Sequence, residues 1–89
     1  MSTAQLNLYP NPNSGQFVIE LKLDDDVNTE ADIQIMNALG QNIYLERTAI
    51  VNGELFNPVK FDGAISDGNY FVRVIVGNKV YTGKIIYQR

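Results

Sequence analysis

Residues 68–89 decide the fold of this chain, and they read GNYFVRVIVGNKVYTGKIIYQR. Two runs of β-branched and aromatic residues flank Gly77-Asn78, a dipeptide that accepts the positive φ of a tight turn without steric cost. If these two residues form the turn, antiparallel pairing determines which residues lie opposite each other along the two strands. The predicted pairs are Val76 with Lys79, Val74 with Tyr81, Val72 with Gly83, Tyr70 with Ile85, Ile75 with Val80, Arg73 with Thr82 and Phe71 with Lys84. We therefore predict a β-hairpin, beyond which Tyr87 to Arg89 run on as a short cationic tail.

The rest of the chain alternates apolar and polar residues with a period near two, as half-buried strands do. The clearest run is 16–23, and a second hairpin is predicted from 31–37 and 42–46. Their core candidates are Phe17, Ile19, Leu21, Leu23, Ile33, Ile35, Ile43 and Leu45. Residues 6–9 form a short edge strand, and 47–51 and 54–61 form two further extended pieces, the second broken by Pro58.

Turn residues separate these strands at short intervals, and no helical period is present. In the loop before Gly68, the one apolar residue is Ile65, which we expect to plug the end of the core. The pattern predicts an all-β fold, an Ig-like antiparallel β-sandwich of about seven strands.

Length and composition narrow the possible functions. The 89 residues suit one domain, in which residues 1–5 are a linker or an arbitrary start and residues 6–89 fold. The chain has no cysteine, and it has no histidine, the usual general base and zinc ligand. An enzyme is disfavoured because Ser14 and Ser66 lack a histidine partner. The net charge of −3 argues against a nucleic-acid partner, since phosphate binding needs a cationic patch.

Two loops leave alternatives open. The stretch Pro10-Asn11-Pro12-Asn13-Ser14-Gly15 is almost entirely turn chemistry, and it is either a recognition loop or a rigid link between two strands. In residues 24–30, Asp24, Asp26, Asn28 and Glu30 fall at alternate positions, as oxygen ligands do in a calcium loop. The helical calcium loop would need glycine at position 29 and glutamate at position 35, and neither is present. This loop is either a solvated acidic connection or a weak cation site.

Three separated motifs fall together in this chain: LYPNPNSGQF at 8–17, IMNALGQNI at 35–43, and GNYFVRV at 68–74 followed by Lys84-Ile85. In combination they resemble the C-terminal sorting domain (type A) of the type IX (Por) secretion system of Bacteroidetes. The resemblance spans about Leu6 to Arg89, and it ends where such domains end. It implies a β-sandwich that acts as a transport signal rather than as a catalyst, and it implies no cofactor.

The resemblance also implies partners and a location. An N-terminal cargo domain would be carried through the periplasm, recognised by the outer-membrane translocon and its shuttle, and then usually released from the sorting domain by a sortase-like signal peptidase. The protein would end up secreted or on the cell surface. The motif positions with structural roles would be Pro10, Asn11, Pro12, Gly15, Gly40, Gln41 and Gly77. The recognition residues would be Gly68, Tyr70, Lys84, Ile85, Ile86 and Arg89, read by edge pairing or by charge-assisted contacts.

Two other functions compete with the sorting signal. A non-catalytic accessory sandwich could grip carbohydrate through aromatic faces, for which Tyr9, Tyr44, Tyr81 and Tyr87 are the candidates. A calcium-stabilised spacer domain would rest on residues 24–30 alone.

Overall fold

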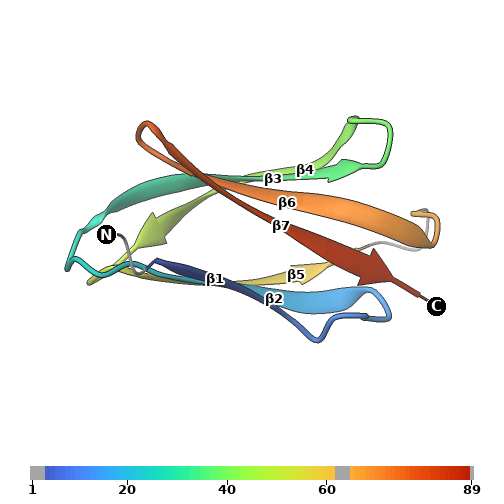
Figure 1. Cartoon of the computed structure of the whole chain (residues 1–89), viewed down its shortest axis with the longest axis horizontal. Coiled ribbons are helices and arrows are strands. Elements are labelled where there is room, and N and C mark those ends of the chain that lie inside the picture. Colours follow the sequence, from blue (N-terminus) through green and yellow to red (C-terminus); the bar gives the residue numbers. More distant parts are fainter. Residues whose placement is uncertain (1–3, 62–64, 89) are drawn as a thin grey trace.

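Two antiparallel sheets pack face to face in this protein (Figure 1). The computed structural model describes residues 4–61 and 65–88, and the strands of this part of the chain follow one another without a helix between them. In order they are β1 (Gln5–Tyr9), β2 (Gln16–Lys22), β3 (Thr29–Asn37), β4 (Asn42–Ile50), β5 (Glu54–Lys60), β6 (Gly68–Val76) and β7 (Lys79–Tyr87). One sheet has the order β1-β2-β5 and the other the order β4-β3-β6-β7. The predicted all-β sandwich is confirmed.

Two details concern the limits of the fold. β1 begins at Gln5, which is the last residue of the segment predicted to be a linker. Within the residues described, no helix is long and apolar enough to cross a membrane.

The β6–β7 hairpin has the register predicted from the Gly77-Asn78 turn. Every predicted pair is observed, from Val76 opposite Lys79 to Tyr70 opposite Ile85. Pairing also continues further than predicted, because Gly68 lies opposite Tyr87. The prediction that Tyr87 belongs to an overhanging tail is therefore wrong: its side chain is only 5% exposed. Arg89 lies outside the described residues.

The core fills the space between the two sheets. On β2, Phe17, Ile19 and Leu21 are buried as predicted, while Leu23 and Ile65 are partly buried against the core. Transfer of each such buried side chain out of water contributes about 1.5–3 kcal/mol, so this face of β2 is a main source of stability.

An aromatic cluster fills one end of the core. The ring of Phe61 lies 5.5 Å from that of Phe17, 5.4 Å from that of Tyr70 and 5.5 Å from that of Tyr87. Two of these contacts are edge-on, an arrangement worth about 0.5–1.5 kcal/mol beyond the area buried. The C-terminal strand is thus joined to the core through Tyr87.

β4 differs from the prediction in two respects. Leu45, predicted to be in the core, points outward and is 65% exposed. The cause is an irregularity in the β3–β4 pairing, where Ile35 lies opposite Tyr44 but Met36 lies opposite Asn42. The extra residue, Ile43, shifts the alternation by one position, as a β-bulge does. β4 also runs unbroken to Ile50, where a separate piece was predicted.

β5 crosses Pro58 without a break, although a break was predicted there. It is one of the two edge strands of its sheet, and an edge strand tolerates proline because one side of its backbone has no strand to pair with.

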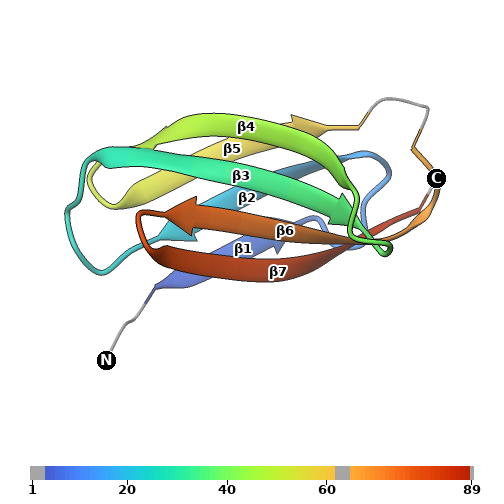
Figure 2. The same cartoon turned by 90° about the horizontal axis from the view of Figure 1, so that it is seen from above.

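The connections divide between the two ends of the sandwich. Because the strands alternate in direction, loop 10–15, turn 38–41, the start of β6 and the finish of β7 lie at one end, which we call the motif end (Figure 2). Residues 23–28, 51–53 and 77–78 lie at the opposite end, where β1 begins. Motifs far apart in the sequence are therefore neighbours in space.

Candidate functional site

At the motif end, two asparagines hold the outer edge of β7. The Asn11 Nδ2 donates to the Lys84 carbonyl at 2.9 Å, and Asn11 Oδ1 accepts from the Ile86 amide at 3.0 Å. The Asn13 amide and Nδ2 both donate to the Ile86 carbonyl, at 2.9 and 3.2 Å, and the Gln88 amide donates to the Asn13 carbonyl at 2.8 Å. We call Asn11 and Asn13 the asparagine clamp.

The loop that carries the clamp is itself fixed to the core. Asn13 is 5% exposed, and its Oδ1 accepts from the Gly15 amide at 2.8 Å. Gly15 has a φ of +118°, and its carbonyl accepts from the Phe61 amide at 2.7 Å. A Cβ on Gly15 would lie 3.4 Å from the Tyr87 ring. Glycine suits this position because its backbone conformation is rare for other residues and the aromatic cluster lies against it.

The loop is therefore more than a link between β1 and β2. Its asparagines occupy the backbone groups that Lys84, Ile86 and Gln88 direct away from β6. Nearer the hairpin turn, Leu8 of β1 packs over Gly83, where a Cβ would lie only 2.8 Å from the leucine Cδ1. While the clamp is closed, a partner strand cannot pair with the last residues of β7.

The predicted recognition residues divide into three groups. Tyr70 and Ile85 point into the core and are 5% and 0% exposed. Lys84 and Ile86 alternate with Ile85 and therefore point to the outer face of the four-stranded sheet. Gly68, with a φ of +153° and open space around it, supplies a backbone conformation at the start of β6. The structure thus places two of these side chains where a partner can reach them.

The central motif forms a stapled turn between β3 and β4. Asn37 Oδ1 accepts from the amides of Leu39 and Gln41, both at 3.0 Å, and Asn37 Nδ2 donates to Gln41 Oε1 at 2.8 Å. Gly40 takes a φ of +84°. These contacts hold Leu39 at the tip, where it is 85% exposed.

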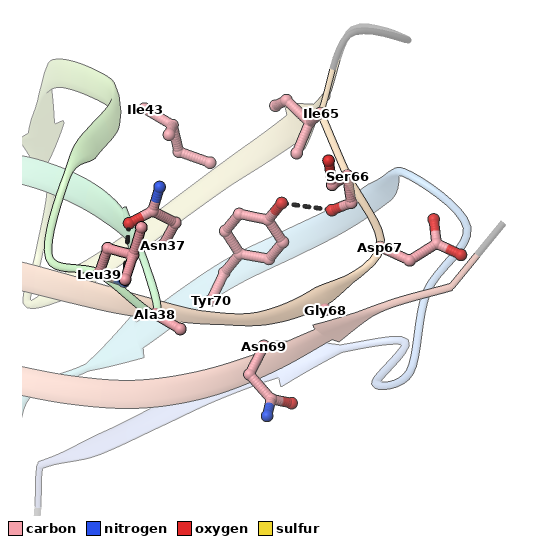
Figure 3. A pocket seen from close by; sticks show the side chains of 10 residues that line it. All are labelled: Asn37, Ala38, Leu39, Ile43, Ile65, Ser66, Asp67, Gly68, Asn69 and Tyr70. Atoms are coloured by element: carbon pink, nitrogen blue, oxygen red, sulfur yellow. Dashed lines mark hydrogen bonds between the residues drawn. The ribbon is translucent and has the colours of Figure 1, made fainter.

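A pocket of about 400 Å³ lies between this turn and the start of β6 (Figure 3). Apolar side chains from Ile43, Ile65 and Tyr70 line it together with the backbone around Gly68. The Tyr70 hydroxyl donates to the Ser66 carbonyl, and burial is the main cause that raises the pKa of Tyr70. The pocket brings the central and the final motif together, and it offers apolar contact and hydrogen bonding.

The acidic loop lies at the opposite end and has a structural role. Asn28 Oδ1 accepts from the Asn52 amide at 3.0 Å, and the Gly53 amide donates to the Val27 carbonyl at 2.8 Å. These bonds fasten the loop to the turn that follows β4. Gly77 forms the hairpin turn at the same end. Across residues 4–61 and 65–88, no three carboxylates gather in a group that could hold a metal ion, and this includes Asp24 and Asp26.

The four candidate tyrosines for carbohydrate binding do not share an exposed face. Tyr87 is in the core, and Tyr9 lies on the outer side of the three-stranded sheet, where it donates to Glu20 at 3.3 Å. Tyr44 and Tyr81 lie opposite Ile35 and Val74, so both point toward the interior from edge strands. A flat aromatic platform cannot be assembled from them.

Comparison with known proteins identifies the motifs as parts of one pattern. The family model described as "Secretion system C-terminal sorting domain" matches residues 7–88 and so covers all three motifs. No curated protein matches the chain.

Proposed function

The chain belongs to the family of type IX secretion-system C-terminal sorting domains, and from this premise we propose that the outer face of the β6–β7 hairpin is its address. A domain of this family, which is generally non-catalytic, directs the secretion of a cargo protein and interacts with the secretion machinery. The observation that carries the proposal is the asparagine clamp, since it closes the edge of β7 and leaves the outer face, with the exposed Lys84 and the partly buried Ile86, open to a partner.

The motif residues then have separate tasks. Tyr70 and Ile85 anchor the hairpin in the core, and Asn11, with Pro10, Pro12 and Gly15 around it, belongs to the loop that clamps β7. Gly40 and Gln41 shape the β3–β4 turn. Most of the motif therefore builds the surface that the translocon and its shuttle read, and few of its residues touch the partner.

The cargo is attached at the other end. β1 begins opposite the motif end, and the long axis of the domain is 37 Å. A cargo domain that precedes β1 leaves the motif end and the outer face of the hairpin free. Transit through the periplasm ends at the outer-membrane translocon, after which a sortase-like signal peptidase cuts on the cargo side of β1.

Export of a reporter tests this proposal. A fluorescent protein with a signal peptide is fused to residues 4–89 and expressed in a host that has the secretion system. We expect the double variant Lys84→Ala and Ile86→Ala to lower the extracellular yield about tenfold, which corresponds to about 1.4 kcal/mol of lost binding. The matched control is Lys22→Ala with Val18→Ala, a cation and an aliphatic residue on the outer side of β2.

The control variant should be exported like the wild type, and both variants should remain folded by circular dichroism. Equal export of the two variants would place the address elsewhere on the domain. If the unchanged fusion stayed in the periplasm, this chain would not act as a sorting signal in that host.

A further inference from the structure

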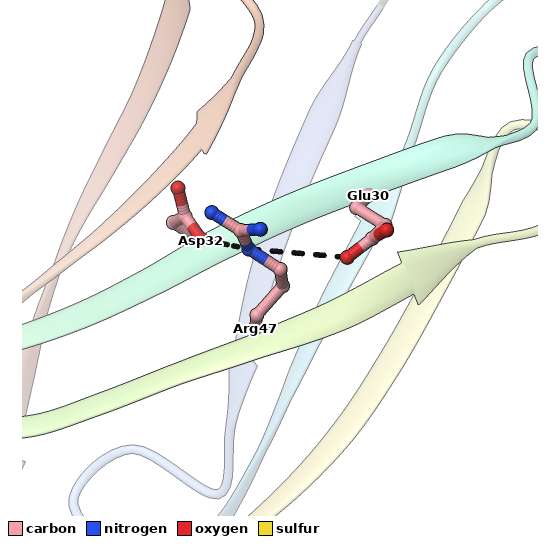
Figure 4. Close-up of polar contacts among 3 residues, drawn as sticks. All are labelled: Glu30, Asp32 and Arg47. Carbon is pink, nitrogen blue, oxygen red and sulfur yellow. Dashed lines mark hydrogen bonds and ion pairs between the residues drawn. The ribbon is translucent and has the colours of Figure 1, made fainter.

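The outer face of the four-stranded sheet has two halves with different charge. On the β3–β4 half, Arg47 Nε lies 2.9 Å from Asp32 Oδ1 and 3.8 Å from Glu30 Oε2 (Figure 4). The two carboxylates and the guanidinium form one exposed network. The positive charge of this half is therefore already paired within the domain.

The β6–β7 half carries two cations whose directly opposite partners are neutral. Arg73 lies between Gln34 of β3 and Thr82 of β7, and Lys84 lies opposite Phe71. Of the ion pairs found among the described residues, none includes either cation. The Nε of Arg73 is also buried without a hydrogen-bond partner in the described part of the chain. Arg73 is thus half-buried, and no carboxylate among the described residues forms an ion pair with it.

Two apolar side chains lie on the same face as these cations. Phe71 is 41% exposed, and Ile86, which lies opposite Asn69, is partly buried on the same face. We call Phe71, Arg73, Lys84 and Ile86 the hairpin patch. An exposed aromatic residue next to an arginine is the composition typical of the centre of a protein interface. The patch is positive although the whole chain has a net charge of −3.

We propose that the hairpin patch docks on an acidic protein surface of the secretion machinery, one that presents carboxylates beside an apolar contact. The inference rests on the proposed function and adds the chemistry of the partner. A carboxylate can bind the guanidinium of Arg73 through charge-assisted hydrogen bonds, and a second can pair with Lys84. An anionic lipid surface fits less well, since polybasic lipid binding uses about four to eight clustered Lys and Arg.

Charge reversal on the patch tests this inference. The same reporter fusion is made with Arg73→Glu alone and with Arg73→Glu plus Lys84→Glu. The matched control is Lys22→Glu with Lys60→Glu, which changes the net charge equally on the outer side of the three-stranded sheet. We expect the double patch variant to lose about tenfold or more of its extracellular yield, Arg73→Glu to lose part of it, and the control to be exported normally.

The outcomes separate this inference from the function on which it rests. If Lys84→Ala with Ile86→Ala blocks export but Arg73→Glu does not, the hairpin is the address and the acidic partner is wrong. If the patch double variant and the control double variant lose extracellular yield equally, the change in net charge and not the patch is responsible, and the inference is contradicted. Flotation of the purified domain with phosphatidylglycerol vesicles should show no binding. If the domain does bind these vesicles, and both added salt and Arg73→Glu abolish the binding, the partner is an anionic membrane and not an acidic protein.

Discussion

A chain that ends at Gly83 is expected not to fold. The truncation removes Ile85 and Tyr87, which are 0% and 5% exposed, together with the strand that the asparagine clamp holds. Loss of a buried isoleucine costs about 2–5 kcal/mol and loss of a buried large aromatic residue about 3–5 kcal/mol. These losses approach the whole stability of a small domain, about 5–15 kcal/mol.

Circular dichroism and thermal melting of the purified domains check this expectation. The control is the full chain with Lys84→Ala and Ile86→Ala, which alters the same strand on its outer face and should melt cooperatively close to the wild type. A cooperative melt of the truncated chain near the wild-type temperature would contradict the expectation. A failure of export after truncation therefore reports on folding, and only outer-face variants report on the address.

The second large effect is expected at the opposite end, for Gly53→Ala. Gly53 has a φ of +75°, and a Cβ there would lie 2.2 Å from the Asp25 carbonyl oxygen, a backbone atom that cannot turn away. The Gly53 carbonyl also accepts a hydrogen bond from the Leu23 amide at 2.8 Å. We expect a loss of about 3 kcal/mol or more, because overpacking adds to the cost of a left-handed alanine.

Gly77→Ala is the matched control for this substitution. Gly77 also has a positive φ, +61°, but nothing lies within 4 Å of its Cβ position. Gly77→Ala should therefore lower the free energy of unfolding only by the cost of a left-handed alanine, about 1–2 kcal/mol. Urea unfolding of the two variants measures the difference. Equal losses would mean that the loop at 23–28 moves aside freely and that its packing on the Asn52-Gly53 turn contributes little.

The register of the last hairpin could be predicted because its information is local. A turn dipeptide fixes one pair, and a strict period of two fixes the rest. How far the pairing of β6 with β7 extends was harder to predict from the sequence. Gly68 and Asn69 have poor strand propensity, so the sequence pattern places the start of β6 too late and assigns Tyr87 to a tail.

Two other features depend on tertiary contacts, which the alternation of apolar and polar residues does not predict. The exposed position of Leu45 follows from one extra residue opposite β3, and the run Asn42 to Leu45 contains no glycine or proline that marks the bulge. The clamp joins residues 73 to 75 positions apart in the sequence. Asparagine beside proline indicates a turn, and nothing in the sequence shows that its side chain also pairs with a distant strand edge.

The central claim is that the opening loop closes the edge of β7, and amide hydrogen exchange tests it most directly. The Ile86 amide donates to Asn11 Oδ1 at 3.0 Å and the Gln88 amide to the Asn13 carbonyl at 2.8 Å. We predict that both amides are protected, and that Asn11→Ala speeds exchange at Ile86 much more than at Gln88. Exchange of both amides in the wild type at the rate of an unstructured peptide would contradict the claim, because the edge of β7 would then be open to a partner strand.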